Sequence, residues 1–233
     1  MNEDIRKMVE LQEIWNKVLN DRSNIERAKK SIQHWEKVVT DLEEKINSAN
    51  NELKNKKSKL DACELELSEK EQKISNLENR RIQLKTQKEV EAIDHELQKH
   101  NTDKDEHEEN VINLMEIIDN LESDLSSLNE ELVKSHEQAE IDIKELQNKI
   151  DSSMTDEEKG MEEFQKGINE LSPECRSRFL KLTGAPHGKA IVLIEDEICQ
   201  GCNFQVPVSI VMDLGDNEKP VVCTNCGRFI YKK

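Results

Sequence analysis

Apolar residues recur along most of the chain in alternating steps of three and four. One run begins Ile25, Ala28, Ile32 and keeps the same frame as far as Leu84, and a second run extends from Ile93 to Leu132. Steps of three and four average 3.5 residues, which is the repeat of a left-handed coiled coil. The pattern therefore predicts long helices that pack along an apolar seam.

The two runs do not share one frame. The nine residues from Leu84 to Ile93 cannot be made from one step of three and one of four, and this break lies near the midpoint of residues 1–172. We therefore favour an antiparallel hairpin within one chain, with its tip within residues 80–92, over a long parallel dimer. Later, between Ala139 and Met154, the steps become 4-3-4-4, which predicts a stutter in the coiled coil.

Glycine and proline divide the chain into two parts. No glycine precedes Gly160, and no proline precedes Pro173. Residues 1–172 have a net charge of −17 and residues 173–233 a net charge of +1. We predict a coiled-coil hairpin arm over residues 1–172 and a small domain over residues 173–233. A short helix, with Ser172 as its N-cap, leads into the small domain.

Several polar residues occupy apolar-frame positions in the far part of the predicted hairpin: Lys70 and Arg81 on its first helix, and His100, Lys104 and His107 on its second. Buried charge is unfavourable unless it is paired. We expect this part of the arm to be wet, frayed or covered by a partner.

The predicted tip is basic. Residues 80–88 carry four positive charges and no negative charge, from Arg80, Arg81, Lys85 and Lys88. A solvated turn explains this composition, and so does a contact site for an acidic partner.

Four cysteines near the C-terminus have the spacing of a metal site. Cys199, Cys202, Cys223 and Cys226 form the pattern C-x2-C-x20-C-x2-C, which is typical of four-cysteine zinc sites. Two tight C-x2-C turns can each present two thiolates to one tetrahedral Zn²⁺. We predict one structural zinc ion per chain.

The residues around these cysteines predict a β-rich zinc ribbon. Residues 190–194 and 229–231 have the composition of short strands, and residues 213–220 that of a surface loop. Gly201 and Gly227 lie in or beside the two cysteine turns. We expect both glycines to let backbone N–H groups point at sulfur.

The predicted zinc site and the absence of catalytic motifs argue against an enzyme. Four cysteines fill a tetrahedral zinc site, whereas catalytic zinc normally keeps a position for water or substrate. The sequence contains no glycine-rich phosphate loop, nucleophile elbow or plausible catalytic triad. It also contains no apolar run of membrane-span length and no secretory signal, so we expect a cytoplasmic protein with no membrane span.

The chain resembles a bacterial family of coiled-coil hairpin proteins with a C-terminal C4-type zinc ribbon. The resemblance covers essentially the whole chain and is carried by Leu11-Gln12, by residues 84–93, by Cys199-Gln-Gly-Cys202 and by the ending Cys223-Thr-Asn-Cys226-Gly-Arg-Phe-Ile-Tyr231. Val90 stands where family members usually have tyrosine. The resemblance implies a non-enzymatic adaptor. Family members are associated with the alternative sigma factor, sigma-54, and with flagellar or type III secretion assemblies, and an RNA-binding role has been attributed within the family.

Three functions remain open at this point. The first is a protein–protein interaction adaptor that binds sigma-54 or secretion components, and the second is an RNA-binding zinc ribbon. The third is a passive coiled-coil spacer, which explains the arm but not the ribbon. Nucleic-acid binding usually needs a basic surface, whereas the ribbon segment has a net charge of only +1. Small candidate patches remain at the basic tip and at Arg228, Lys232 and Lys233. The partner is unidentified, and the chain is expected to be a monomer or a dimer.

Overall fold

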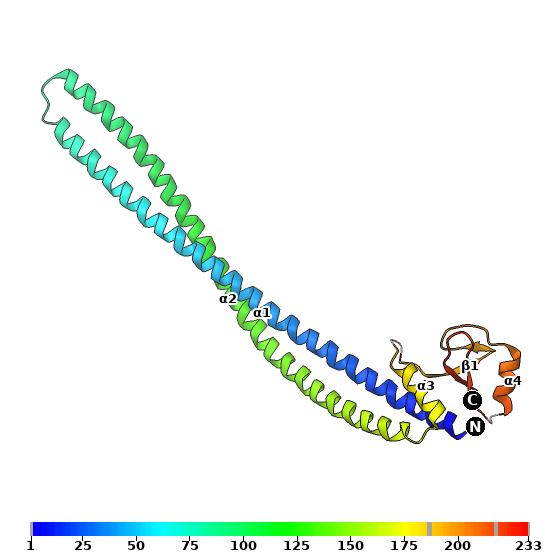
Figure 1. Cartoon of the computed structure of the whole chain (residues 1–233). Helices are drawn as coiled ribbons and strands as arrows, with labels where there is room; N and C mark the ends of the chain where they lie inside the picture. Colours follow the sequence, from blue (N-terminus) through cyan, green and yellow to red (C-terminus); the bar gives the residue numbers. More distant parts are fainter. Residues whose placement is uncertain (1, 186–187, 217–218, 233) are drawn as a thin grey trace. The chain divides into compact units, whose positions relative to one another are not determined.

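A computed structural model describes residues 2–185, 188–216 and 219–232 of the chain. Helix α1 spans Glu3–Arg81, and helix α2 spans Gln87–Ile168. A small domain that contains short strands follows them (Figure 1). The predicted fold class, a mainly helical hairpin followed by a small β-containing zinc ribbon, is confirmed.

The chain divides into two compact units, whose bounds differ from those predicted at residue 172. The ribbon unit consists of Met1–Gln33 and Asp142–Lys233, and the arm unit consists of His34–Ile141. The two ends of the hairpin are therefore grouped with the small domain. One buried apolar cluster explains this grouping, because it joins Met8 and Leu11 of α1, Phe164 of α2, and Ile191 and Phe229 of the small domain.

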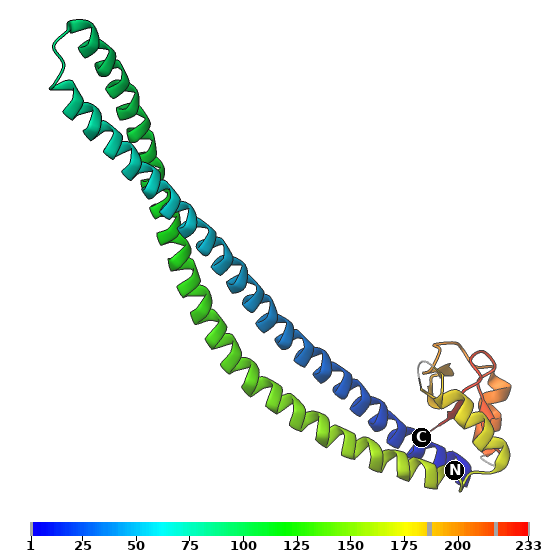
Figure 2. The same ribbon diagram turned by 60° about the vertical axis from the view of Figure 1, so that its left-hand side comes forward.

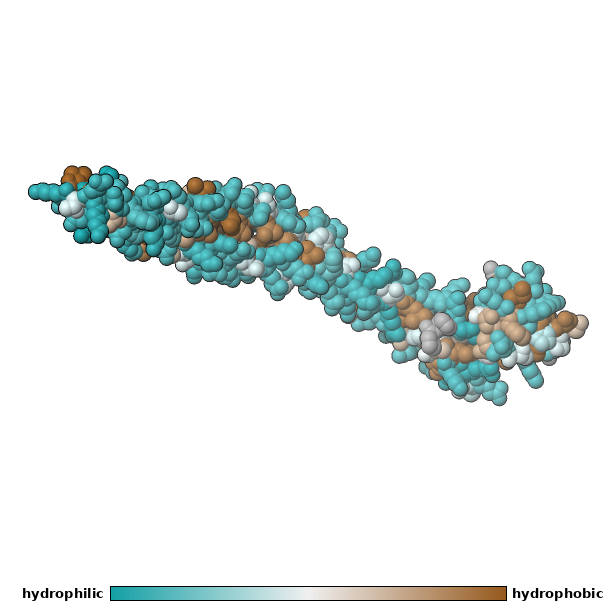
Figure 3. Space-filling model, turned by 90° about the horizontal axis from the view of Figure 1, so that it is seen from above, coloured by the Kyte–Doolittle hydropathy of each residue, from teal (hydrophilic) through white to brown (hydrophobic). Residues whose placement is uncertain are grey.

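In the arm unit, α1 and α2 lie side by side and run in opposite directions (Figures 1 and 2). The apolar frame faces inward, and its most buried members are Leu42, Ile46, Ile74, Ile93, Ile118, Leu125 and Ala139. Hydrophilic residues cover most of the face of this unit that Figure 3 shows. This is the amphipathic pattern that the sequence predicts.

The lysines in the seam of the arm unit are paired with acidic residues. The Nζ atom of Lys70 lies 2.6 Å from a carboxylate oxygen of Asp103, and the Nζ of Lys104 lies 3.7 Å from a carboxylate oxygen of Glu71. Each pair joins α1 to α2. The two lysines therefore find acidic residues on the facing helix. The Nδ1 atoms of His100 and His107 are buried without a hydrogen-bond partner among the described residues, so coverage of this part of the seam by a partner stays a prediction.

The turn between the two helices is short and capped. Backbone bonds from Gln83 N–H to the Arg80 carbonyl (3.0 Å) and from Leu84 N–H to the Arg81 carbonyl (3.3 Å) tighten the end of α1. Thr86 precedes α2, and its hydroxyl is hydrogen-bonded to the carboxylate of Glu89. This threonine and glutamate have the spacing of a capping box, which starts a helix without glycine or proline.

In the ribbon unit, the predicted stutter is absent from the seam of α2. Met154, which the stutter placed in the core, is 45% exposed, and Ser153 is buried in its place. The alternation of three and four continues without a break through residues that are not all apolar: Ile143, Leu146, Ile150, Ser153, Glu157, Gly160, Phe164, Gly167 and Leu171.

Small residues in this seam leave room for side chains of α1. A Cβ atom on Gly160 would lie 2.8 Å from Cγ2 of Val18, and one on Gly167 would lie 2.7 Å from Cδ2 of Leu11. The apolar pattern missed this seam because serine and glycine carry no apolar signal, although they allow close approach of the two helices.

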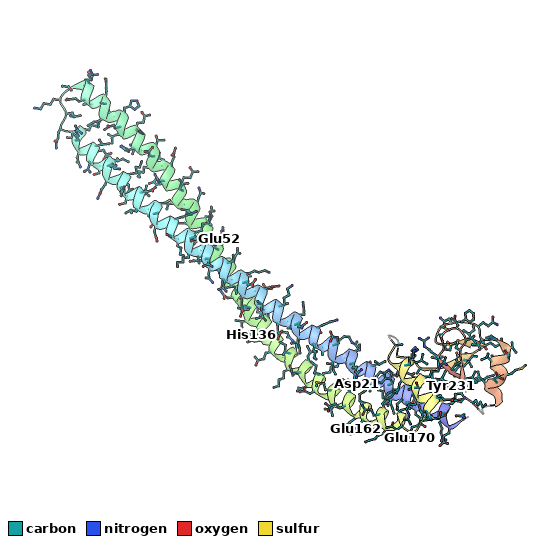
Figure 4. The ribbon with its side chains drawn as sticks, viewed as in Figure 1. Asp21, Glu52, His136, Glu162, Glu170 and Tyr231 are labelled. Atoms are coloured by element: carbon teal, nitrogen blue, oxygen red, sulfur yellow. The ribbon has the colours of Figure 1, made fainter. Side chains whose placement is uncertain are left out.

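The small domain begins with helix α3, Pro173–Thr183, which has Ser172 as its N-cap. The Ser172 hydroxyl donates to the carboxylate of Asp4 on α1 at 2.7 Å. Nearby, the Nζ of Lys7 lies 2.7 Å from the carboxylate of Glu170, which is labelled in Figure 4. Asp4 of α1 thus holds the residue that precedes α3, and the ion pair beside it joins α1 to the segment between α2 and α3.

A four-stranded sheet follows, with the strand order β2-β1-β4-β3. Its strands are β1 (Ile191–Glu195), β2 (Ile198–Cys199), β3 (Val221–Val222) and β4 (Phe229–Tyr231). Strand β1 pairs parallel to β4 and antiparallel to β2. The two strands predicted at residues 190–194 and 229–231 are therefore the central pair of the sheet.

Helix α4, Val208–Asp216, corrects the prediction of a surface loop over residues 213–220. Residues 213–216 form its last turn, and residues 217–218 lie outside the described part of the chain. The glycine and aspartates of this segment resemble loop composition. Apolar residues of α4 nevertheless pack on the ribbon core, which stabilises the helix.

Candidate metal centre

The sulfur atoms of the four cysteines form a compact cluster. The Sγ atoms of Cys199 and Cys226 lie 3.8 Å apart, and so do those of Cys202 and Cys223. All four Sγ atoms lie within 4.8 Å of one another. A tetrahedron with zinc–sulfur bonds of ~2.3 Å has sulfur–sulfur edges of about 3.8 Å. The four cysteines therefore form the site of one structural zinc ion.

Two similar turns position these sulfurs. Cys199 ends β2, and its carbonyl accepts from the N–H of Cys202 at 3.3 Å. Cys223 follows β3, and its carbonyl accepts from the N–H of Gly227 at 2.9 Å. Each turn ends in a left-handed residue, Asn203 (φ 55°) or Gly227 (φ 70°). These residues reverse the chain directly after the second cysteine of each turn.

The backbone N–H of Gly201 points at the sulfur of Cys199, as predicted, and glycine has a second role at this position. The residue with positive φ at the first turn is Asn203, not Gly201. A Cβ atom on Gly201 would lie 3.0 Å from Cδ of Arg228 and 3.1 Å from Cγ1 of Val192. Glycine at position 201 therefore permits close packing. The left-handed conformation is adopted by Asn203 instead, and asparagine tolerates it better than most residues.

The environment of the thiols favours a bound cation. Burial raises the pKa of the Cys199 thiol to about 12, and burial also raises the pKa of Cys226. Burial acts against the thiolate of Cys202 too, but hydrogen bonds from the Asn225 side chain and the Phe204 N–H outweigh it and lower its pKa to about 7. Four thiolates this close repel one another. A divalent cation offsets their charge and holds them deprotonated.

Two arginines brace the cysteine turns. Arg228 follows the second turn, and its Nη1 donates to the carbonyl of Gly201 in the first turn at 2.8 Å. Arg178 on α3 donates from Nε to the carbonyl of Gly227 at 3.0 Å. Each guanidinium satisfies a carbonyl that the turn itself leaves free. The helix and both turns are thereby held in one arrangement around the zinc site.

Gln12 connects the same domain to α1. Its Oε1 accepts from the N–H of Ala190 (2.6 Å) and from that of Ile191 (3.3 Å), at the start of β1. Its Nε2 donates to the carbonyl of Gly188 and to the side chain of Asn16, both at 2.9 Å. The Gln12 side chain is only 7% exposed. It satisfies backbone groups that precede the sheet and would otherwise be buried without partners.

The basic residues predicted at the tip have different environments. Arg81 forms an ion pair with Asp94 on α2. Arg80, Lys85 and Lys88 are exposed, and no ion pair involves them within the part of the chain that the structure describes. Beside them, Ile82 is 82% exposed. The tip therefore keeps three free cations around an exposed apolar side chain.

The basic residues of the ribbon that were considered as nucleic-acid contacts have different environments. Arg228 donates to two backbone carbonyls, those of Lys189 and Gly201. Lys232 is exposed, and Lys233 lies outside the described residues. Among the described helices, none has the length and apolar character needed to cross a membrane.

Comparison with known proteins gives one family match. A family described as a C4-type zinc ribbon domain matches residues 198–230, which include all four cysteines. No curated protein sequence matches the chain.

The fold of the whole chain is similar to solved structures. CT398 from Chlamydia trachomatis has a TM-score of 0.85 and 19% identity, with coverage of 99% of this chain and 98% of that one. The HP0958 protein from Helicobacter pylori has a TM-score of 0.69 and 15% identity, with coverage of 100% and 98%. A protein from Mycobacterium smegmatis has a TM-score of 0.58 and 15% identity, with full coverage of both chains. At these identities, the similarity concerns the fold alone.

Proposed function

We propose that this chain is a non-enzymatic adaptor that binds other proteins and uses zinc only to hold its ribbon together. The closed zinc site is the observation that carries the proposal. Four cysteine sulfurs at tetrahedral spacing leave the metal no position for water or substrate. A metal held in this way contributes folding free energy rather than chemistry.

The tip of the hairpin is the proposed contact site. Arg80, Lys85 and Lys88 are exposed cations, and Ile82 between them is 82% exposed. An acidic partner with a small apolar pocket is complementary to this arrangement. Sigma-54 is the first protein to test, because the family that the chain resembles is associated with it. Flagellar or type III secretion components follow for the same reason.

RNA binding is the alternative, and the contacts of the ribbon weigh against it. Arg178 and Arg228 each donate to backbone carbonyls. Those donors are occupied, whereas phosphate binding uses free basic side chains. Retention of RNA in place of protein is therefore the result that would replace the adaptor by this alternative.

A pull-down with a tip variant tests the proposal. The variant carries Arg80→Glu, Lys85→Glu and Lys88→Glu, and it keeps Arg81 because that residue is paired with Asp94. We expect its binding to purified sigma-54, or to the protein that the wild type retains from bacterial cytosol, to weaken about tenfold or more. Nuclease treatment should leave the wild-type binding unchanged.

A matched control changes the same charge elsewhere on the arm unit. Lys37, Lys54 and Lys59 are exposed, and no ion pair of the described residues involves them. Their joint replacement by glutamate should leave binding within about twofold of the wild type, because long-range attraction alone is screened at physiological salt. Equal losses in the two triple variants would show that only net charge matters, and would remove the tip from the proposal.

A further inference from the structure

Helix α4 is apolar on both of its sides. Its inner side places Ile210, Val211 and Leu214 against the core of the ribbon. Its outer side carries Val208 and Met212, which are one turn apart and are 53% and 70% exposed. A helix with apolar residues all round is normally buried on all sides. The outer side of α4 therefore lacks a cover within the described part of the chain.

More apolar surface lies on the strand and turn that precede this helix. Ile198 in β2 is 39% exposed, and Phe204, just after the first cysteine turn, is 50% exposed. Residues Ile198 and Gln205 are bridged, which brings the two segments side by side. Figure 3 shows apolar residues at the surface of its right-hand end, where the small domain lies. We call Ile198, Phe204, Val208 and Met212 the ribbon patch.

The chain segment that carries the ribbon patch is acidic, while Arg228 contacts its first cysteine turn and Lys232 lines a neighbouring groove. Residues 190–218 contain six acidic residues and no lysine or arginine. The turn Glu195-Asp196-Glu197 borders a groove of about 550 Å³ that also contacts Val211 of α4 and Lys232. No ion pair of the described residues involves Glu195, Asp196 or Asp213, so these carboxylates are free to meet a partner. The net charge of +1 for residues 173–233 conceals this acidic side.

We infer that the ribbon patch binds an amphipathic helix of another protein whose apolar face is flanked by lysine or arginine. The exposed apolar side chains accommodate the apolar face, and the carboxylates of Glu195, Asp196 and Asp213 attract the basic flanks. This inference rests on the proposed adaptor function and gives it a second contact site, in addition to the tip. The unpaired carboxylates of this segment disfavour nucleic acid and anionic lipid and favour a basic protein segment as the partner.

A synthetic peptide tests this site on the zinc-loaded full chain. The probe is a fluorescent helix of about 18 residues with leucines on one face and lysines on the other. We expect it to bind the wild type and to bind the double variant Phe204→Gln/Met212→Gln at least about tenfold more weakly. A peptide with glutamate in place of lysine should not bind. Glu195→Gln with Asp213→Asn should weaken binding and reduce its salt dependence.

The control variant changes exposed apolar side chains of the arm unit. Leu65 and Met115 are 64% and 50% exposed, and Leu65→Gln/Met115→Gln should leave peptide binding within about twofold. One zinc ion per chain in every variant shows that the ribbon is folded. Equal weakening by both double variants, or equal binding of the glutamate peptide, would overturn the inference.

Sedimentation of the wild type completes the test. A dimer that the Phe204/Met212 variant dissociates would show that a second copy of the chain covers the patch, and would also overturn the inference. Peptide binding is independent of the tip. Loss of partner binding in the tip variant with intact peptide binding therefore separates the two proposals.

Discussion

At the residue scale, Gln12 shows how one polar side chain joins two parts of the sequence. It lies on α1, yet three of its four hydrogen bonds reach the backbone of residues 188–191. A glutamine suits this position because its amide offers an acceptor and a donor at once. The sequence shows Gln12 as one polar residue of an amphipathic helix and says nothing about these partners.

Replacement of Gln12 by leucine should destabilise the backbone that this side chain holds. Gln12→Leu leaves the N–H of Ala190 and the carbonyl of Gly188 buried without partners, at a cost of about 1–3 kcal/mol. Hydrogen exchange followed by mass spectrometry should show faster exchange at residues 188–192. Gln33→Leu, an exposed position of the same helix, serves as the control and should leave exchange there unchanged. Similar protection in both variants would contradict the assigned role.

Residues of the metal site differ in how far the sequence could predict them. The cysteine spacing is a local signal, so Cys199, Cys202, Cys223 and Cys226 were identified as ligands without the structure. Arg178 was not identified, because its acceptor lies 49 residues away and the fold alone brings the two together. The left-handed Asn203 could have been noticed, since it follows Cys202 as Gly227 follows Cys226.

At the element scale, the seam of the ribbon unit depends on small residues. Gly167 is in contact with Leu11, which is fully buried. Sequence patterns detect apolar seams, so a seam that runs through Ser153, Gly160 and Gly167 produces the pattern of a stutter. The spacing of three and four is regular through this region. Small residues occupy the seam positions because α1 and α2 approach closely there.

Gly167→Ala should therefore destabilise the protein although alanine favours helices. Alanine would add about 1 kcal/mol of helix propensity, whereas forcing its methyl group against Leu11 costs about 1–3 kcal/mol. We expect a net loss of stability of about 1 kcal/mol in denaturant unfolding, in contrast to a neutral or positive effect of Ser152→Ala at an exposed position of the same helix. Equal stabilisation by both substitutions would contradict the tight packing at Gly167.

The ion pair between Lys70 and Asp103 should make the stability of the arm unit depend on pH. The hydrogen bond from Lys70 lowers the pKa of the Asp103 carboxyl below its ordinary value of 3.8. Because the folded-state pKa is below the unfolded value, the pair stabilises the helices at neutral pH and loses its contribution as the pH falls through the folded-state pKa.

Thermal unfolding of a charge-reversed pair checks this prediction. Asp103→Lys should lower the melting temperature at pH 7, because two lysines would then face each other, and Lys70→Asp in the same chain should restore it. The difference between wild type and Asp103→Asn should shrink in acid, where Asp103 is itself protonated. A difference that stays constant down to strongly acidic pH would show that the pair contributes through packing and not through charge.

The sequence predicted the long elements better than the short ones. Two helices of 79 and 82 residues repeat their pattern many times, so their type was clear. Helix α4 has only nine residues, and its glycine and aspartates favoured a loop. The start of α2 has a readable signal in the capping box Thr86-Gln-Lys-Glu89, which begins a helix without glycine or proline.

At the scale of the whole molecule, the zinc ribbon and the two ends of the hairpin share one apolar core. Ala190, Ile191 and Phe229 of the small domain pack in the same cluster as Met8 and Phe164 of the long helices. Loss of zinc should therefore disturb more than the ribbon. This coupling could not be predicted from sequence, because the cluster joins residues more than 170 positions apart.

Removal of zinc tests this coupling. In Cys223→Ser, or after chelation, we expect rapid hydrogen exchange over residues 190–230, because the metal supplies the folding free energy of the small domain. Exchange should also rise at residues 5–20 of α1, while residues 34–141 stay helical and protected. An unchanged exchange rate at residues 5–20 would show that the hairpin ends are stable without the ribbon.

The proposed adaptor function depends on a zinc ion that is structural and fully enclosed by sulfur. X-ray absorption spectroscopy of the zinc-loaded protein tests this claim most directly, in combination with elemental analysis. The expected result is one zinc ion per chain with four sulfur neighbours at ~2.3 Å and no oxygen or nitrogen neighbour. A shell of three sulfurs and one oxygen would reveal an open position for water or substrate, and would contradict the account.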